Sequence, residues 1–198
     1  MTLISMTKSL KLLAIVTLIT LSLFTTASAQ VYRANRSFEE DENLPDYDSI
    51  KYAKVIKMWQ RSALKGNKLA QYIVGSYYYN GEGVEKDFQE AIKWFSLAAN
   101  KGLAQAQFSL GLCYYNGEGT EKNVAGAVKW WQISARKGCG EAQYYLGLCY
   151  YEGNGVEKDL KKARYWIVCS ANNGYNDAID FAEANGFDLE ENIGVKPQ

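Results

Sequence analysis

The sequence predicts an all-α protein built as an α-solenoid, which is a stack of similar helix pairs. The chain repeats itself with a period of 36 residues, and a fixed period of about 20 to 50 residues is typical of stacked arrays. Each repeat holds two segments with apolar residues at helical spacing. The 198 residues include only two prolines, and because proline interrupts helices, this composition favours helices over a loop-rich scaffold.

Residues 1–29 have the pattern of a secretory signal peptide. Lys8 and Lys11 precede an apolar run at residues 12–24, and small residues follow up to Ala29. The alternative is an uncleaved membrane anchor, but a mainly apolar run of 13 residues is short of the roughly 20 that span a bilayer. We therefore expect an exported mature chain, periplasmic or extracellular, without stable membrane insertion after cleavage.

Residues 30–50 read as a flexible acidic lead-in. Four carboxylates follow one another from Glu39 to Glu42, and Pro45 lies close by. Neighbouring like charges repel one another and leave little apolar surface to bury. A solvated linker is the prediction, and an acidic docking peptide is the alternative.

Residues 51–187 form the predicted solenoid. The strings AQYIVGSYYYNGEGVEKD, AQFSLGLCYYNGEGTEKN and AQYYLGLCYYEGNGVEKD begin at Ala70, Ala106 and Ala142. They define full repeats at 70–105, 106–141 and 142–177. A half repeat at 51–66 matches a second helix alone, a degenerate cap follows at 178–187, and 188–198 is a tail. Polar, degenerate ends suit a solenoid because its terminal repeats face water.

The first segment of each repeat predicts a helix over 70–80 and its equivalents. Its core face holds Ala70, Val74, Gly75 and Tyr78. Gly81 ends the helix, since glycine adopts a positive φ without a Cβ clash. Glycine within a helix costs about 1 kcal/mol relative to alanine, so Gly75 predicts a close approach of the partner helix at Ala91.

The second segment predicts a helix that begins after Asp87 and ends at Gly102. Asp87 is the expected N-cap, with Glu90 completing a capping box. The expected buried residues are Ala91, Trp94, Phe95 and Ala98. By the same register, Trp130 is the corresponding core tryptophan of the second repeat.

The repeat resembles the Sel-1-like repeat, a helix-turn-helix relative of the tetratricopeptide repeat. In the third copy, the residues that carry the resemblance are Ala142, Leu146, Gly147, Tyr150, Gly153, Gly155, Val156, Asp159, Ala163, Trp166, Ala171 and Gly174. The resemblance covers Lys51 to Phe187 and implies a right-handed α-solenoid that serves as a protein-interaction scaffold. Its motif is structural, so it implies no catalytic or binding residues.

Candidate binding residues occupy first-helix positions that point away from the predicted core. We call eight of them the first-helix stripe: Tyr72, Tyr79, Phe108, Leu112, Tyr115, Tyr144, Leu148 and Tyr151. The ninth such position is Ser76. The resemblance places first helices on the concave surface, and tyrosine is enriched at interfaces. The alternative is that the stripe packs against the neighbouring repeat.

The four cysteines are Cys113, Cys139, Cys149 and Cys169. Cys113 and Cys149 share a repeat position and lie one repeat apart, about 10 Å, which exceeds the roughly 7 Å Cα limit for a disulfide. Cys139 and Cys169 are the candidate disulfide, and buried thiols are the alternative. Without CxxC or histidine, we expect no metal site.

Several enzyme classes are excluded or disfavoured. The chain has no histidine, so it has no Ser-His-Asp or Cys-His nucleophile system. Two S-x-x-K matches, at Ser62 and Ser134, are repeat positions without the accompanying K-T-G motif. Glu82 and Glu118 lie in solvated turns and are poor candidates for an acid–base pair. We expect no enzyme activity and no cofactor, and the balanced 22 basic and 22 acidic residues disfavour nucleic acid.

The sequence therefore predicts a non-catalytic, exported scaffold that binds a protein or peptide through the first-helix stripe. Two alternatives remain at this level. One is an immunity-type inhibitor of a secreted toxin, and the other is a cell-wall-binding or hydrolytic protein.

Overall fold

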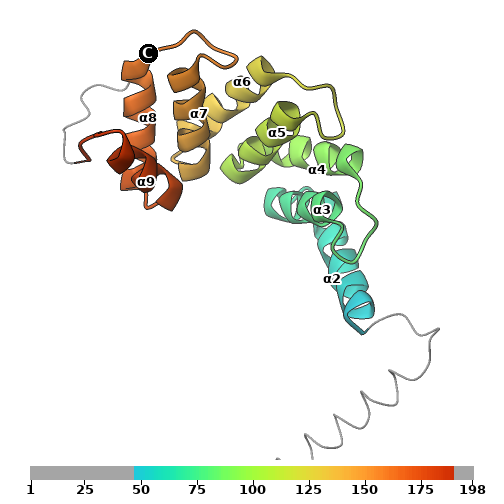
Figure 1. The fold of residues 1–198 in the computed structure, drawn as a ribbon. Coiled ribbons are helices and arrows are strands. Elements are labelled where there is room, and N and C mark those ends of the chain that lie inside the picture. Colours follow the sequence, from blue (N-terminus) through green and yellow to red (C-terminus); the bar gives the residue numbers. More distant parts are fainter. Residues whose placement is uncertain (1–46, 190–198) are drawn as a thin grey trace, which may run out of the picture. The chain divides into compact units, whose positions relative to one another are not determined.

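The computed structural model describes residues 47–189, with side chains described from residue 54 onward. The predicted signal peptide, residues 30–46 of the lead-in and residues 190–198 of the tail lie outside the described residues. The described part contains eight helices and no strand, which confirms the all-α prediction (Figure 1). The helices are α2 (Tyr47–Leu64), α3 (Lys68–Asn80), α4 (Phe88–Asn100), α5 (Ala104–Asn116), α6 (Val124–Ala135), α7 (Gly140–Glu152), α8 (Leu160–Asn172) and α9 (Asn176–Ala184).

Each helix from α3 to α8 packs on the next one along the chain. The first helices of the repeats are α3, α5 and α7, and the second helices are α4, α6 and α8. Helix α2 is a second helix, and α9 is a first helix that closes the array. Because α2 begins at Tyr47, residues 47–50 are helical where the sequence predicted lead-in. No helix in the described range is long and apolar enough to cross a membrane.

The predicted helix stops are confirmed. Gly81, Gly117 and Gly153 follow the first helices in the left-handed conformation, with φ of 77°, 80° and 79°. Each of these glycine N–H groups donates to a carbonyl four residues earlier, at 2.9 Å. The turn is therefore the same in all three repeats, and it fixes where each second helix begins.

The predicted N-caps are confirmed, but the capping box is not. The side chains of Asp87, Asn123 and Asp159 accept hydrogen bonds from the first backbone N–H groups of α4, α6 and α8. The Glu90 side chain pairs with Lys93 at 2.8 Å instead of returning to the cap. The Asp87 N–H is already used, because it donates to the carbonyl of Tyr78 at 2.9 Å.

The core of each repeat is a large side chain under the mid-helix glycine of the first helix. A Cβ on Gly75 would lie 2.6 Å from Phe95 Cδ1, and one on Gly147 would lie 2.5 Å from Ile167 Cγ1. The close approach predicted at Ala91 exists, since the Ala91 carbonyl would be 3.3 Å away, but Phe95 is nearer. The glycine therefore makes room for a side chain more than for a backbone.

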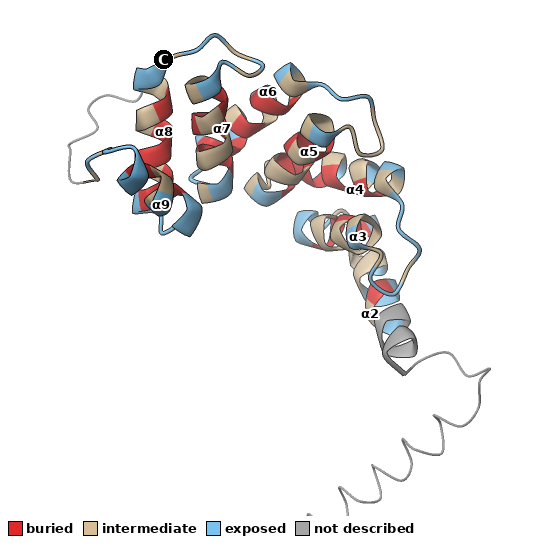
Figure 2. Ribbon diagram, in the orientation of Figure 1, coloured by how far each residue is buried: buried red, intermediate tan, exposed pale blue. Residues whose placement is uncertain are grey.

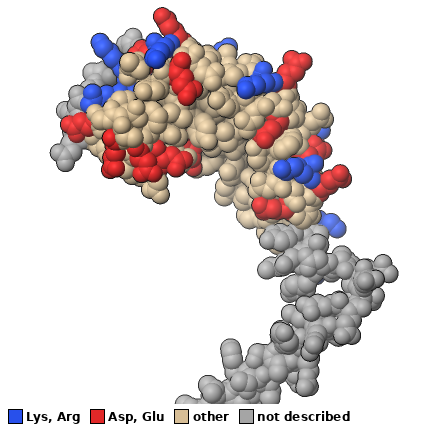
Figure 3. Space-filling view, in the orientation of Figure 1, with Lys and Arg blue, Asp and Glu red and all other residues tan. Residues whose placement is uncertain are grey.

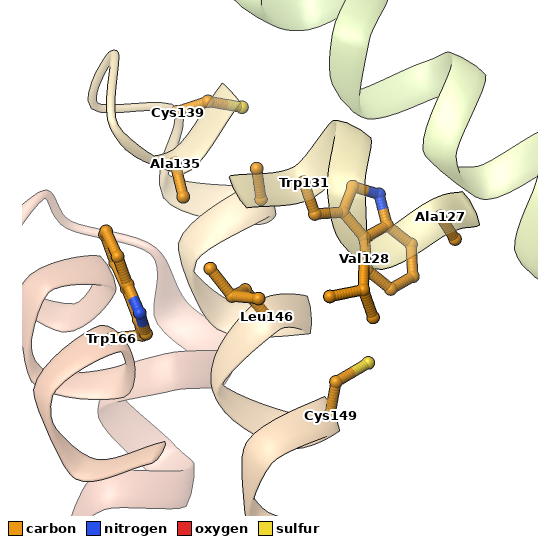
Figure 4. Close-up of a cluster of buried hydrophobic side chains, with 9 residues drawn as sticks. Ala127, Val128, Trp131, Ala135, Cys139, Leu146, Cys149 and Trp166 are labelled. Carbon is orange, nitrogen blue, oxygen red and sulfur yellow. The ribbon is translucent and has the colours of Figure 1, made fainter. Parts of the chain in front are cut away.

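The second repeat corrects the predicted core tryptophan. Trp131 is fully buried beneath Gly111, whereas Trp130 is half-exposed. Trp94, also expected in the core, is likewise half-buried. Figure 4 shows Trp131 beside Val128, with Leu146 of α7 and Trp166 of α8 completing the cluster. The two adjacent tryptophans differ by about 100° of helix rotation, and this difference decides which one is buried.

Three buried glutamines connect the repeats, and the sequence reasoning missed them. The Nε2 atoms of Gln71, Gln107 and Gln143 donate to the carbonyls of Ala63, Ala99 and Ala135, at 3.0–3.1 Å. These carbonyls lie at the end of the preceding second helix, where each also accepts a hydrogen bond from the N–H of the glycine three residues later. The first turn of each first helix thus caps the helix before it. In Figure 2 nearly all of the buried residues lie within the helices, while the turns between them are mainly exposed or half-buried.

A second type of hydrogen bond also connects successive repeats, and its donor is a lysine that follows a second helix. Lys101 Nζ donates to the Gly66 carbonyl at 2.5 Å, and Lys137 Nζ donates to the Gly102 carbonyl at 2.9 Å. Each donor lies 35 residues after its acceptor. The end of one second helix is therefore completed by the end of the next.

Candidate partner-binding face

The first-helix stripe lies on α3, α5 and α7, and all eight of its residues are half-buried. None is fully covered by the fold, and none stands free in solvent. The stripe therefore combines packing within the array with surface that a partner can contact. Its three sections, one for each repeat, differ in how much of this surface is left.

The first section borders a cavity of about 170 Å³ between α3 and α5. The residues that line it are Tyr72, Ser76, Tyr79, Asn80, Phe95, Ser109 and Leu112. Three aromatic rings and a leucine form its apolar walls, and two serines and an asparagine supply polar groups. An apolar recess with a few polar groups is the usual form of a binding pocket.

Tyr79 is held at the edge of this cavity by contacts with two repeats. Its ring packs against Phe88 at a centroid distance of 5.2 Å. Its hydroxyl donates to Glu118 Oε2 at 2.7 Å, across the repeat boundary. Burial raises the pKa of Tyr79, and the hydrogen bond and negative charge of Glu118 raise it further. Tyr79 is therefore a neutral donor at neutral pH, with its hydroxyl already directed.

The second section is more deeply integrated into the core. Phe108 lies 5.5 Å from Tyr145 and 6.4 Å from Trp131, measured between ring centroids. Tyr115 lies 5.3 Å from Trp131, and its hydroxyl accepts a hydrogen bond from Asn154 Nδ2 at 3.4 Å. These two stripe residues thus support the buried tryptophan as well as facing outward.

The third section contacts α9. Tyr144 and Tyr151 lie 6.2 Å and 5.3 Å from Phe181 between ring centroids. The Tyr151 hydroxyl donates to Asn185 Oδ1 at 3.2 Å. Leu148, the remaining stripe residue of this repeat, is half-buried on α7. The stripe therefore ends against the cap helix rather than continuing past it.

Three contributors to this face were not selected from the sequence. Phe95 reads as a core residue, yet it also lines the cavity. Tyr145 occupies a position not assigned to the stripe, yet its ring lies 5.2 Å from Trp131 and 5.5 Å from Phe108. Glu118 accepts the Tyr79 hydrogen bond. The sequence offered one signal for Glu118, which is its recurring position in the turn after a first helix. One repeat later this position holds Asn154, whose amide donates a hydrogen bond to Tyr115 instead of accepting one.

The four cysteines form no disulfide in the structure. All four are reduced in the structure, so it does not contain the candidate Cys139–Cys169 disulfide. Burial raises the pKa of both Cys113 and Cys149 to about 12. The negative charge of Glu118 contributes to the shift at Cys113, and that of Glu152 to the shift at Cys149. Cys139 donates to Glu141 Oε2 at 3.2 Å. The described residues hold no cluster of cysteine and carboxylate side chains suited to a metal ion.

The stacked helix pairs, their shared turn and the repeated core define a class of protein, the helix-pair α-solenoid. Within that class, the model of the Sel1 repeat matches residues 68–103, 104–139 and 140–175. These ranges cover more than half of the chain, and the chain belongs to the Sel1 repeat family. Sel1 repeat proteins generally mediate protein–protein interactions and are generally non-catalytic.

Solved structures support the fold. A Sel1 repeat protein from Oxalobacter formigenes is 34% identical, with a TM-score of 0.59 over 71% of this chain and 63% of that one. The Escherichia coli protein c5321, a protective antigen of uropathogenic strains, is 34% identical, with a TM-score of 0.64 over 84% of this chain and 35% of that one. Cysteine-rich protein B of Helicobacter pylori, 21% identical with a TM-score of 0.55 over 65% of this chain and 95% of that one, shares the fold.

Human sel-1 homolog 2 is 40% identical over 40 residues, which are 20% of this chain and 6% of that protein. The chain thus spans a small part of this curated relative. It also spans less than two thirds of the Oxalobacter and Escherichia chains that it resembles.

Proposed function

We propose that this protein is an exported, non-catalytic scaffold that binds a protein or peptide on the face formed by its first helices. The observation that carries the proposal is the cavity between α3 and α5, which is lined by stripe residues from two successive repeats. A recess at a repeat boundary accepts a side chain that a flat helix surface would leave in water. The half-exposed rings on either side extend the contact area along the array.

A site-specific crosslinker tests the binding face. A photoreactive residue in place of Ser76 lies in the cavity, and the same residue in place of the exposed Lys93 lies on a second helix. We expect a discrete crosslinked product, identified by mass spectrometry in the native host, from position 76 only. Equal products from both positions, or a product from position 93 alone, contradict the proposal.

A matched pair of leucine substitutions then measures the contribution of the cavity. Leu112 lines the cavity, whereas Leu97 is 46% exposed on α4. Leu112→Ala is expected to weaken binding of the crosslinked partner about tenfold or more, as loss of a pocket contact does. Leu97→Ala is expected to leave the affinity unchanged. Melting temperatures of both variants show whether any loss reflects unfolding.

Export is tested separately, because it rests on the N-terminal sequence alone. Expression of the full chain in a two-membrane bacterium should place the protein in the periplasmic fraction. The intact mass is expected to correspond to a chain that begins at Gln30. A cytoplasmic protein with the mass of the full chain contradicts this part of the proposal and leaves the binding face untouched.

A further inference from the structure

Charge is segregated between the two kinds of helix. The first helices α3, α5, α7 and α9 carry one cation and five carboxylates, which are Lys68, Glu141, Glu152, Asp177, Asp180 and Glu183. From residue 54 onward, the second helices α2, α4, α6 and α8 carry eight cations and one carboxylate, which are Lys54, Lys57, Arg61, Lys93, Lys129, Lys161, Lys162, Arg164 and Glu90. The five carboxylates all lie on α7 and α9, so the first-helix face is acidic at its C-terminal end, while the second helices are basic.

Carboxylates from the turns and from the first helices lie near tyrosines of the stripe. Glu118, in the turn after α5, accepts a hydrogen bond from the Tyr79 hydroxyl at 2.7 Å. Burial and then nearby charge, from Glu152 among others, raise the pKa of Tyr115. Burial, and the charges of Asp177 and Asp180, likewise raise the pKa of Tyr144. In three successive repeats, a half-buried phenol therefore has negative charge close by.

The carboxylates are densest at the C-terminal end of the stripe. Figure 3 shows Asp and Glu side chains gathered over α9. The ring of Tyr144, whose pKa is raised by burial and then by Asp177 and Asp180, lies 5.4 Å from the Tyr175 ring, between ring centroids. The Tyr175 hydroxyl donates to Asp177 Oδ2 at 3.0 Å. Aromatic faces and carboxylates are thus combined at one place, and both attract cations.

Cations already occupy such places within the protein itself. Lys122 Nζ lies 5.5 Å from the centroid of the Tyr115 ring, and Lys158 Nζ lies 5.8 Å from that of Tyr151. Both lysines come from the turns after the first helices, so they cover the outer edge of the stripe.

We infer that the partner segment bound on the first-helix face is a cationic peptide. Its lysine or arginine side chains lie over the stripe rings and pair with the carboxylates around Tyr144. One of its apolar side chains fills the cavity between α3 and α5. This inference rests on the proposed function and adds the chemistry of the partner. An acidic segment would meet five carboxylates on the first helices, and like charges across an interface oppose binding.

Three labelled peptides test the inference with the full mature chain. They are 12-residue probes that share the same leucine and phenylalanine positions and carry lysine, glutamate or serine at the remaining positions. Fluorescence anisotropy measures their binding at low and moderate salt. We expect the lysine peptide to bind, the serine peptide to bind more weakly and the glutamate peptide not to bind.

Charge-neutralising variants then distinguish a specific contact from general attraction. The double variant Asp177→Asn and Asp180→Asn is expected to weaken the lysine peptide about three- to tenfold, as loss of two partly exposed ion pairs does. The matched control is Glu85→Gln with Glu157→Gln, which removes the same charge from exposed turns. That control is expected to leave the affinity unchanged. Equal weakening by both double variants overturns the inference.

The remaining outcomes separate this inference from the proposed function. The serine or glutamate peptide could bind as tightly as the lysine peptide, with Leu112→Ala weakening the binding of each. The inference of a cationic partner would then be wrong, and the proposed binding face would still hold. If no peptide binds, the inference is also wrong. The proposed function itself fails if the crosslinks do not favour position 76, or if Leu112→Ala leaves binding of the crosslinked partner unchanged.

Discussion

At the scale of single residues, the mid-helix glycine and the side chain beneath it act as one packing unit. Gly75 faces Phe95, Gly111 faces Trp131 and Gly147 faces Ile167. The volume under the glycine is thus filled by a different side chain in each repeat. The Trp131 indole also donates to the Phe108 carbonyl at 3.2 Å. This bond ties the core of the second repeat to the helix that carries the stripe.

A methyl group at the second of these glycines tests the unit. In Gly111→Ala, the new Cβ lies 2.5 Å from Trp131 Cδ1, so the indole has to move. Overpacking of this kind costs about 1–3 kcal/mol, which outweighs the gain of about 1 kcal/mol in helix propensity. The matched control is Gly140→Ala, whose Cβ meets nothing closer than 3.5 Å. Urea denaturation should show a destabilised Gly111→Ala and an unchanged or more stable Gly140→Ala.

The adjacent tryptophans provide a second residue-scale prediction. Trp131 is fully buried, so Trp131→Ala is expected to cost about 3–5 kcal/mol of unfolding free energy. Trp130 is half-exposed, and Trp130→Ala should cost less than half as much. Chemical denaturation of the two variants measures the difference. Equal losses would mean that the two rings share the core, contrary to this structure.

At the scale of helices, the boundary between repeats is completed by a polar network. In the third repeat, Asn173 Nδ2 donates to Gln143 Oε1 at 2.7 Å, and Gln143 in turn caps Ala135. In the second repeat the corresponding residue is Lys137, which reaches only the Gly102 carbonyl. The amide oxygen of Gln107 then has no partner among the described residues. A lysine and an asparagine at equivalent positions thus satisfy the boundary differently.

Exchanging these two residues tests the network. Asn173→Lys removes the donor to Gln143 Oε1 and leaves a buried acceptor unpaired, which costs about 1–3 kcal/mol. Lys137→Asn places a donor near Gln107 and should be neutral or stabilising. Thermal melts should show a lower melting temperature for Asn173→Lys and an unchanged or higher one for Lys137→Asn. A stable Asn173→Lys variant would contradict it.

At the scale of the whole molecule, the buried acidic groups make stability depend on alkaline pH. The pKa of the Cys113 and Cys149 thiols is about 12 in the folded chain, against 9.0 for an unperturbed thiol. The pKa of Tyr79 is raised as well. For groups of this kind the unfolded chain releases protons first as pH rises. Their stabilising effect is complete below about pH 9 and is lost between about pH 9 and 12.

Urea midpoints measured from pH 7 to 11 check this dependence. We expect a constant midpoint up to about pH 9 and a progressive fall above it. The double variant Cys113→Ala with Cys149→Ala removes two of the titrating groups, so its midpoint should fall less steeply, whatever its value at pH 7. An equally steep fall in the variant would assign the dependence to other groups.

How far the sequence predicts this molecule depends on the kind of contact. The helix stops at Gly81 and the caps at Asp87 are local signals, and both were predictable. Gln107 reads as a surface residue, because nothing local shows that a helix end lies over it. The choice between Trp130 and Trp131 depends on how the helix is rotated about its axis. Aligning the repeats does not determine that rotation closely enough to distinguish two adjacent residues. The cavity between α3 and α5 depends on the spacing of successive repeats, which the sequence does not state.

The contacts across repeat boundaries span fixed separations, which are 35 residues for the lysine bonds and 39 for the tyrosine bonds. Each partner belongs to the neighbouring copy of the same 36-residue unit. Duplication or loss of one whole unit by recombination therefore leaves every boundary with equivalent partners, whereas a gain or loss of any other length breaks them. Lineages can then change the number of units, and so the length of the binding face, in single genetic events without first losing a folded chain.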